Sequence, residues 1–292
     1  MIHASTTPGR ATLFAFSGAV VIGGGNFVAV KFSNEELAPL FGAALRFTGA
    51  AALFFGLAWT RRIPLPRGRA AWGAAIYGLL GFGLAYAFLY YALVGLPAGT
   101  ASVILASVPL LTLAFAVVHG QERLSAKGIV GGILAIVGIA VLSARAMGGE
   151  VRAIYFLSAL LGAVAAAESS VVAKSLPRLD PVVTNAVGMT AGAAMLWIAS
   201  FALGEPWALP QTARTWVVLG YLVVLGSVAL FILFLYVIER WTASAAVYAI
   251  ALMPVVAVAL GALLAGEPIT WELTLGGILM MSAVYVGALS RG

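Results

Sequence analysis

Two charged side chains, Arg46 and Glu168, lie inside apolar stretches where charge is expensive. Glu168 follows a run of alanines in the segment 165–170. At the centre of a membrane-spanning helix a charge costs about 2.5–3.5 kcal/mol on insertion scales. Glu168 could therefore receive a substrate ammonium or a coupling proton. The alternatives are a structural partner to another polar residue and a carboxyl kept neutral by burial.

Arg46 has three interpretations. A buried pair with Glu168 would lower the cost of both charges, although Arg46 is expected nearer the outer surface. Arg46 could instead face Glu35 or Glu36 at the outer mouth. It could also bind a substrate carboxylate directly.

Three uncharged polar residues are further candidates for binding a solute. Asn26 could bind substrate or hold two helices together, as amides do in bilayers. Tyr86 and Tyr90 are four residues apart and share a helix face, which could form a cavity wall for cationic or aromatic solutes. Tyrosines near a helix end can also be interfacial anchors.

Two prolines lie in the middle of apolar segments. Pro109 and Pro254 each remove a backbone hydrogen bond, which predicts hinges or static bends. Other polar residues on the same segments are candidates for lining a solute route: Ser102, Ser107, Ser244 and Tyr248.

The composition excludes several classes of protein. Of the residues, 63% are hydrophobic and 9% charged, against roughly 45–50% and 25% in soluble domains. There is no cysteine, there are two histidines, and no HExxH, GxSxG or phosphate-binding GKS/GKT motif occurs. We therefore expect no enzyme, no cofactor and no metal site. The net charge of +6 is interpreted as a topology signal rather than as a sign of nucleic-acid binding.

The chain is predicted to be an all-α integral membrane protein with ten transmembrane helices. Apolar runs long enough to cross a bilayer are expected at 11–31, 37–60, 70–94, 98–119, 126–144, 152–174, 181–203, 214–238, 242–265 and 271–290. With the N-terminus inside, eleven basic residues fall on the inner side and four on the outer side. Both termini are therefore expected in the cytoplasm.

An internal repeat divides the chain into residues 1–148 and 149–292. Tyr91, Pro109, Glu122 and the segment 131–134 recur 145 residues later as Tyr236, Pro254, Glu267 and 276–279. Earlier in each half the offset is 142, which pairs Asn26 with Glu168. Because each half has five helices, an odd number, the second half is expected to be inverted relative to the first, with a site between them.

These motifs resemble the drug/metabolite transporter superfamily and, within it, the EamA-type exporters. The segments that carry the resemblance are 253–256, 266–270 and 276–277 in the second half, 108–111, 121–124 and 131–132 in the first, and 25–31 at the start. It implies a secondary transporter of the bacterial inner membrane whose helices 1, 3, 4, 6, 8 and 9 surround a central cavity. Length and helix plan are most similar to the YddG-type amino-acid exporters.

That resemblance implies that the protein contacts membrane lipid and exports a small-molecule substrate, namely neutral or aromatic amino acids. An exporter of cationic drugs such as organic dications is the alternative. Helices 5 and 10 are peripheral in the family and could support a homodimer. A nucleotide-sugar exchanger should offer several basic groups to phosphates, and only Arg46 lies within a predicted helix core.

Overall fold

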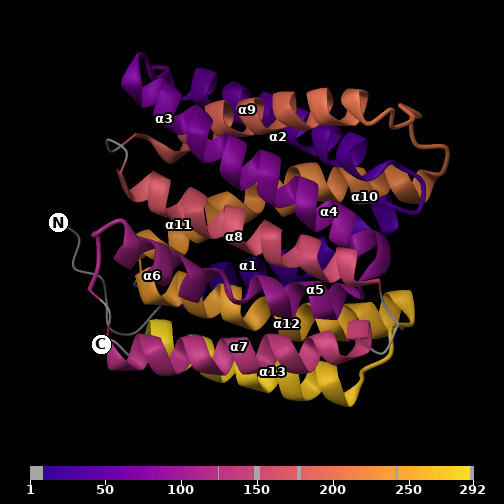
Figure 1. Cartoon of the computed structure of the whole chain (residues 1–292). Helices are drawn as coiled ribbons and strands as arrows, with labels where there is room; N and C mark the ends of the chain where they lie inside the picture. Colours follow the sequence, from indigo (N-terminus) through magenta and orange to yellow (C-terminus); the bar gives the residue numbers. More distant parts are fainter. Residues whose placement is uncertain (1–8, 124, 148–151, 176–178, 241–242, 290–292) are drawn as a thin grey trace.

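The computed structural model describes residues 9–123, 125–147, 152–175, 179–240 and 243–289, except for the side chains of 145–147, 238–239, 243–248 and 288–289. The regular secondary structure of the described residues is all helical, and the helices form one bundle (Figure 1). In its first half the helices are α1 (Arg10–Ser33), α2 (Pro39–Thr60), α3 (Arg69–Gly78), the π-helix η1 (Leu79–Leu84), α4 (Ala85–Gly95), α5 (Ala98–Leu105), α6 (Val108–Val118) and α7 (Ala126–Met147).

The second half repeats this order. Its helices are α8 (Ala153–Ser175), α9 (Pro181–Ala202), α10 (Ala213–Val223), the π-helix η2 (Val224–Ala229), α11 (Leu230–Arg240), α12 (Ala243–Ala265), α13 (Trp271–Val284) and the π-helix η3 (Tyr285–Leu289). Each apolar run expected from the sequence corresponds to one helix or to consecutive helices, with ends that agree within about three residues.

Eight of these segments are long and apolar enough to cross a membrane. They are α1, α2, α3 to α4, α5 to α6, α7, α8, α9 and α10 to α11. Within the described residues α12 and α13 contribute the shorter apolar stretches Ala249–Ala265 and Trp271–Gly287. Outward side chains of the long segments are large and apolar, as a lipid environment requires: Ile136 on α7, Ile198 on α9 and Val217 on α10 are each about 70% exposed.

The repeat is visible in the backbone itself. The π-helices η1 and η2 lie 145 residues apart, and α5 and α12 begin at Ala98 and Ala243, again 145 apart. A π-helix inserts one extra residue into a turn and leaves a carbonyl without its usual partner. The two halves therefore share an irregularity that hydropathy alone does not reveal.

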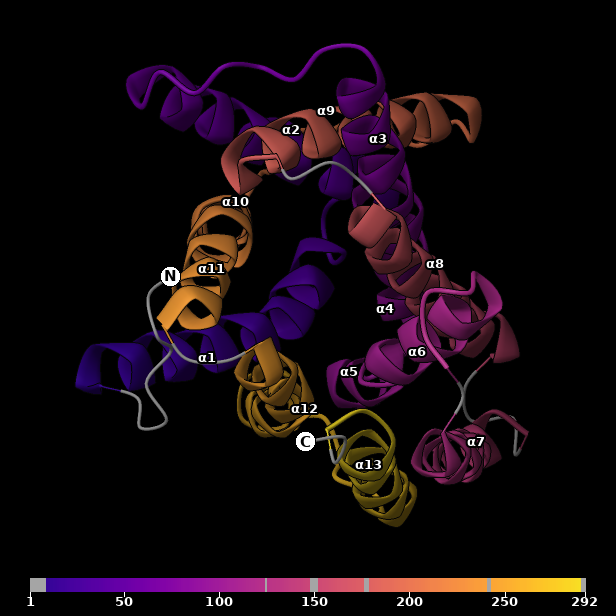
Figure 2. The same cartoon turned by 90° about the vertical axis from the view of Figure 1, so that its left-hand side faces the viewer.

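The helices are arranged around a centre. Figure 2 looks at the face where α1 begins, here called the terminal face, and shows α1, α12, α5, α6, α8, α4 and α11 around that centre. The other end of the bundle is called the opposite face. In both views α2 and α9 lie at one edge and α7 and α13 at the other.

The two prolines have different local structures. Pro109 lies in the first turn of α6, directly after the break at Ala106 and Ser107 that separates α5 from α6. Pro254 lies inside α12, which continues through it. In the first turn of a helix a proline is tolerated, because the N–H that it lacks has no intrahelical partner there. The break between α5 and α6 thus has no counterpart in α12, and the hinge role of both residues stays a prediction.

Close contacts between glycines hold α9 against α3 and η1. A Cβ added at Gly78 would lie 2.0 Å from the carbonyl oxygen of Gly188, and one at Gly192 would lie 2.7 Å from the Phe82 Cβ. Inside a bilayer, van der Waals packing replaces the hydrophobic effect as the main attraction between helices. Small residues at these positions therefore decide how closely the helices approach.

We predict that Gly78→Ala lowers thermal stability, because its methyl group meets backbone rather than a flexible side chain. Overpacking of this kind costs about 1–3 kcal/mol. The matched control is Gly220→Ala in α10, where an added Cβ has no atom within 4 Å. Thermal unfolding in detergent should show a lower midpoint for Gly78→Ala and an unchanged or higher one for the control. Equal midpoints would contradict the packing argument.

Candidate functional site

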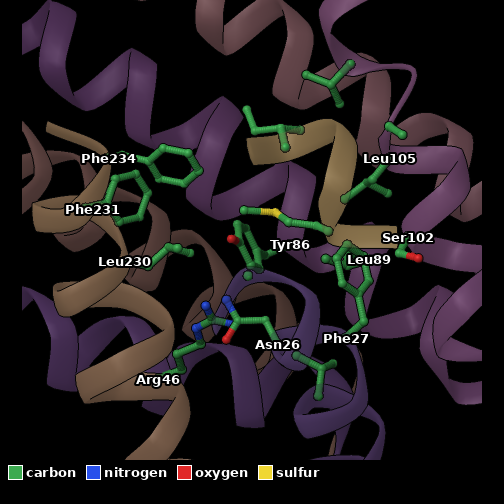
Figure 3. A pocket seen from close by; sticks show the side chains of 16 residues that line it. Asn26, Phe27, Arg46, Tyr86, Leu89, Ser102, Leu105, Leu230, Phe231 and Phe234 are labelled. Atoms are coloured by element: carbon green, nitrogen blue, oxygen red, sulfur yellow. The ribbon is translucent and has the colours of Figure 1, made fainter. Parts of the chain in front are cut away.

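A cavity of about 210 Å³ lies between helices of the two halves (Figure 3). It is mostly apolar, and its polar lining residues are Asn26 on α1, Arg46 on α2, Tyr86 on α4 and Ser102 on α5. The remaining lining residues are Gly23, Phe27, Val30, Leu89, Leu105, Ala106, Val108, Leu230, Phe231, Phe234, Ile250 and Met253. It is smaller than the roughly 300–1,000 Å³ typical of drug-sized ligands.

Arg46 is held in the wall by the π-helix of the second half. Its Nη2 donates to the carbonyl oxygen of Gly226 over 2.9 Å, and its Nε donates to Ser227 Oγ over 3.0 Å. Asn26 Nδ2 donates to the same Gly226 carbonyl over 3.0 Å. Because η2 breaks the regular i to i−4 ladder, this carbonyl is available to side chains of α1 and α2. One carbonyl thus positions two candidate binding residues.

Two polar atoms beside this carbonyl have no partner in the described structure. They are Arg46 Nη1 and Asn26 Oδ1, and both are buried. Arg46 as a whole is only 1% exposed. Buried donors and acceptors left unsatisfied are rare and cost about 1–3 kcal/mol each. An unused donor next to an unused acceptor in a cavity wall is suited to a ligand that offers the opposite pair.

The positive charge of Arg46 is stabilised by aromatic rings rather than by a carboxylate. Its Cζ lies 5.0 Å from the ring centroid of Tyr86 and 5.2 Å from that of Phe47. Among the ion pairs of the described residues, none involves Arg46. Cation–π contacts are worth about 2 kcal/mol when desolvated. The site therefore keeps a buried cation without a counter-ion.

The proposed pairing of Arg46 with Glu168 is wrong. Glu168 pairs with His119 instead, with 3.5 Å between Oε1 and Nε2. Pairing with Glu35 or Glu36 is also wrong. Glu35 binds Arg214, and Glu36 accepts from the Thr212 hydroxyl.

The loop carboxylate Glu36 is stabilised in its charged form. Hydrogen bonds, first from the Thr215 side chain and then from Gln211 and Thr212, lower its pKa below the ordinary value. These contacts tie the connection between α1 and α2 to the start of α10. Glu35 and Glu36 thus hold the loop between α1 and α2, and neither is paired with the guanidinium of Arg46.

Glu168 lies on α8 and does not line the cavity. Its side chain is 30% exposed and that of His119, at the end of α6, is 43% exposed. Glu168 is therefore less buried than an isolated charge in an apolar helix would be. Partial solvation and the His119 partner both lower the cost that the sequence alone implies.

The other predicted site residues divide between the wall and its surroundings. Tyr86 lines the cavity, whereas Tyr90 is fully buried behind it, with the two ring centroids 6.5 Å apart. Ser102 lines the cavity, but its hydroxyl donates to Gly99 O over 2.7 Å. Ser107 lies outside the lining and donates to Ile104 O. The side chains of Ser244 and Tyr248 lie outside the described residues.

Sequence reasoning missed the apolar part of the wall. Leu230, Phe231 and Phe234 of α11 line the cavity, as do Phe27 and Met253. Figure 3 shows the three α11 residues on one side and Phe27 on the other. The spacing of Leu230, Phe231 and Phe234 places them on one helix face. However, α11 is apolar on most sides, so the pattern cannot separate a cavity face from a lipid face.

A model of the EamA-like transporter family matches residues 10–144 and again residues 153–288. The chain belongs to this family of membrane transporters. The double match agrees with the repeat seen in the sequence and in the π-helices. This EamA-family chain is thus a multi-pass membrane transporter.

Several relatives of this EamA-family transporter are similar over nearly their whole length. The uncharacterized inner membrane transporter YedA of Escherichia coli K12 is 28% identical over 91% of this chain and 87% of its own. A probable amino-acid metabolite efflux pump of Salmonella typhimurium is 28% identical over 91% of both chains. A solved crystal structure shares the fold, with a TM-score of 0.67 and 20% identity over 96% of both chains.

We predict that Arg46→Met leaves stability unchanged or raises it while abolishing solute binding. The substitution removes a buried charge that has no counter-ion. It leaves no polar partner stranded, because Gly226 O still accepts from Asn26 and Ser227 Oγ still donates to Leu222 O over 2.9 Å. Thermal unfolding and ligand-binding calorimetry on the same preparation check both parts. A large loss of stability would show that Arg46 serves the fold.

Proposed function

We propose that this EamA-family transporter exports small carboxylate-bearing solutes with an apolar side chain, of which neutral and aromatic amino acids are the main class. The observation that carries the proposal is Arg46 Nη1, a buried guanidinium donor without a partner in the cavity wall. Charge-assisted hydrogen bonds from a guanidinium to a carboxylate are strong and directional. A carboxylate here would also supply the counter-ion that Arg46 lacks.

The neighbouring groups fit the rest of an amino acid. Asn26 Oδ1 is an unpartnered acceptor beside Arg46 and suits the α-ammonium. The apolar wall of Phe27, Phe231 and Phe234 would then take the side chain. The similarity to a probable amino-acid metabolite efflux pump supports the same class.

A dication fits this cavity poorly. No acidic residue of the described chain lines it, and its charged lining residue is the cation Arg46. A cationic solute would face repulsion in a medium of low dielectric constant. Export of organic dications is thus the alternative that flux measurements should exclude.

We further propose that export occurs by alternating access in a bacterial inner membrane. Ten transmembrane helices in two inverted halves, with both termini in the cytoplasm, would let the halves exchange conformations around the cavity. The basic residues concentrated at the terminal face support this orientation. The inner membrane is also the location named for the relative YedA.

Glu168 and His119 are proposed to link transport to protons. Both are ionisable, partly exposed and on the terminal-face side of the bundle, with Glu122 and Lys174 paired nearby. Protonation of Glu168 would release His119 and change the charge at the entrance. The cavity itself would stay neutral apart from Arg46.

The function is tested by flux into and out of liposomes that contain the purified protein. Labelled leucine and phenylalanine should be transported, and an organic dication should not. Arg46→Met should reduce amino-acid flux at least tenfold, the loss expected from one buried charge-assisted contact. Trp59→Phe, at an 83% exposed residue outside the cavity, is the control and should keep its flux. Dication flux alone would refute the proposal.

The coupling role is tested by the pH dependence of the same flux. Glu168→Gln keeps the shape of the side chain and cannot titrate, so flux should lose its dependence on an imposed pH gradient. His119→Gln should shift the pH profile without removing it. If the active Glu168→Gln protein keeps the parent pH profile, that carboxylate does not carry the proton.

A further inference from the structure

Glu267 joins the two halves at the opposite face. Its carboxylate accepts from the backbone N–H of Ala98 over 2.9 Å and 2.8 Å, one distance for each oxygen. Lys31 Nζ lies 2.5 Å from Oε1, and the Glu267 side chain is only 8% exposed. One buried carboxylate thus connects the end of α1, the start of α5 and the corner after α12.

Two physical reasons make this contact favourable. Ala98 is the first residue of α5, where N–H groups lack intrahelical partners and the helix dipole favours a negative charge. Gly261 provides the room, because a Cβ there would lie 2.5 Å from Glu267 Oε2. The contact holds α5 of the first half against the corner after α12 of the second at this face.

The repeat places the same parts at the terminal face. Glu122 lies 145 residues before Glu267, and Ala243, the first residue of α12, lies 145 after Ala98. The corners match in backbone detail: Glu267 N donates to Gly261 O over 3.1 Å, and Glu122 N donates to Ala116 O over 3.1 Å.

The second carboxylate also pairs with a lysine of a neighbouring helix. Glu122 binds Lys174 Nζ over 2.8 Å, and its side chain is 33% exposed. Figure 2 shows the end of α6 and the start of α12 on opposite sides of the centre of the bundle. At the terminal face the equivalents of Glu267 and Ala98 therefore lie on helix ends that are apart, whereas Glu267 and Ala98 are in contact at the opposite face.

We propose that Glu267 and Glu122 are alternating latches, each of which caps the first turn of a helix in the other half when its own face is closed. In the present conformation Glu267 caps α5 and the opposite face is closed. In the exchanged conformation Glu122 caps α12 and the terminal face is closed. The proposal rests on the alternating access proposed above and identifies the contacts that exchange.

The lysines do not exchange in this scheme. Lys31 on α1 and Lys174 on α8 are one position away from exact repeat equivalents, and each is paired with its glutamate here. The ion pairs therefore contribute to both conformations and cancel. Only the bond between carboxylate and helix N-terminus differs between the two, and it sets their relative stability.

The test uses a single introduced thiol, because the chain has no cysteine. Ser102→Cys places the thiol in the cavity wall, one helical turn after Ala98 in α5. A membrane-impermeant maleimide is applied, without solute, to intact cells and to inverted membrane vesicles. The ratio of the two labelling rates reports which face is open.

The two latches predict opposite shifts of this ratio. In the Ser102→Cys background, labelling should be faster from the terminal face. Glu267→Gln should raise the relative rate from the opposite face about five- to tenfold, the effect expected for a charged helix cap. Glu122→Gln should lower it, and the double variant should return the ratio to that of the parent. If Glu267→Gln does not fold, Glu122→Gln alone tests the proposal: a lower relative rate from the opposite face supports it, and a higher or unchanged rate refutes it.

Glu205 supplies the matched control. It accepts from the backbone N–H groups of Leu40 and Phe41 over 3.1 Å and 2.9 Å, at the start of α2 on the same face. Because α2 and α9 lie side by side at one edge of the bundle, this contact is expected in both conformations, and Glu205→Gln should leave the ratio unchanged. Shifts of Glu267→Gln and Glu122→Gln in the same direction, or no shift, would overturn the proposal.

The labelling and flux experiments fail separately. Opposite ratio shifts without amino-acid flux would support the latches and refute the proposed substrate. Amino-acid flux with unshifted labelling ratios would support the proposed substrate and refute the latches.

Discussion

The carbonyl of Gly226 is the group on which the candidate site depends. Inside a bilayer every backbone polar group needs a partner from the protein, since water is absent. The π-helix η2 leaves this carbonyl to side chains, and Arg46 and Asn26 both bind it. Without that irregular turn, neither residue would have a fixed position in the cavity wall.

The backbone next to the π-helix of the first half has a neutral partner. Ser169 of α8 donates to the carbonyl oxygen of Tyr77, which lies in α3 just before η1, over 2.9 Å. In the second half the corresponding region binds a guanidinium and an amide. The two halves thus keep the same backbone and differ in the side chains placed on it. Charge is concentrated on one side of the cavity.

Asn26 and Glu168 have different surroundings although they are equivalent in the repeat. They correspond by the offset of 142 residues, but Asn26 lies in the cavity wall while Glu168 lies beside His119 and is partly exposed. The cavity wall thus contains the amide of the first half, and the carboxylate of the second half lies outside the lining.

The sequence by itself determined the helices, the repeat and the polar residues whose burial in a membrane costs so much free energy that a functional role is expected. Hydropathy can be read along the chain without its three-dimensional structure, and it located the ends of the helices within about three residues. The 145-residue offset can be read in the same way, and it revealed the repeat. Arg46 and Asn26 were singled out because polar groups in apolar helices are costly. Only the tertiary structure decided their partners. The choice among Glu168, Glu35 and the Gly226 carbonyl depends on helix rotation and on an irregular turn, and neither changes the pattern of apolar residues.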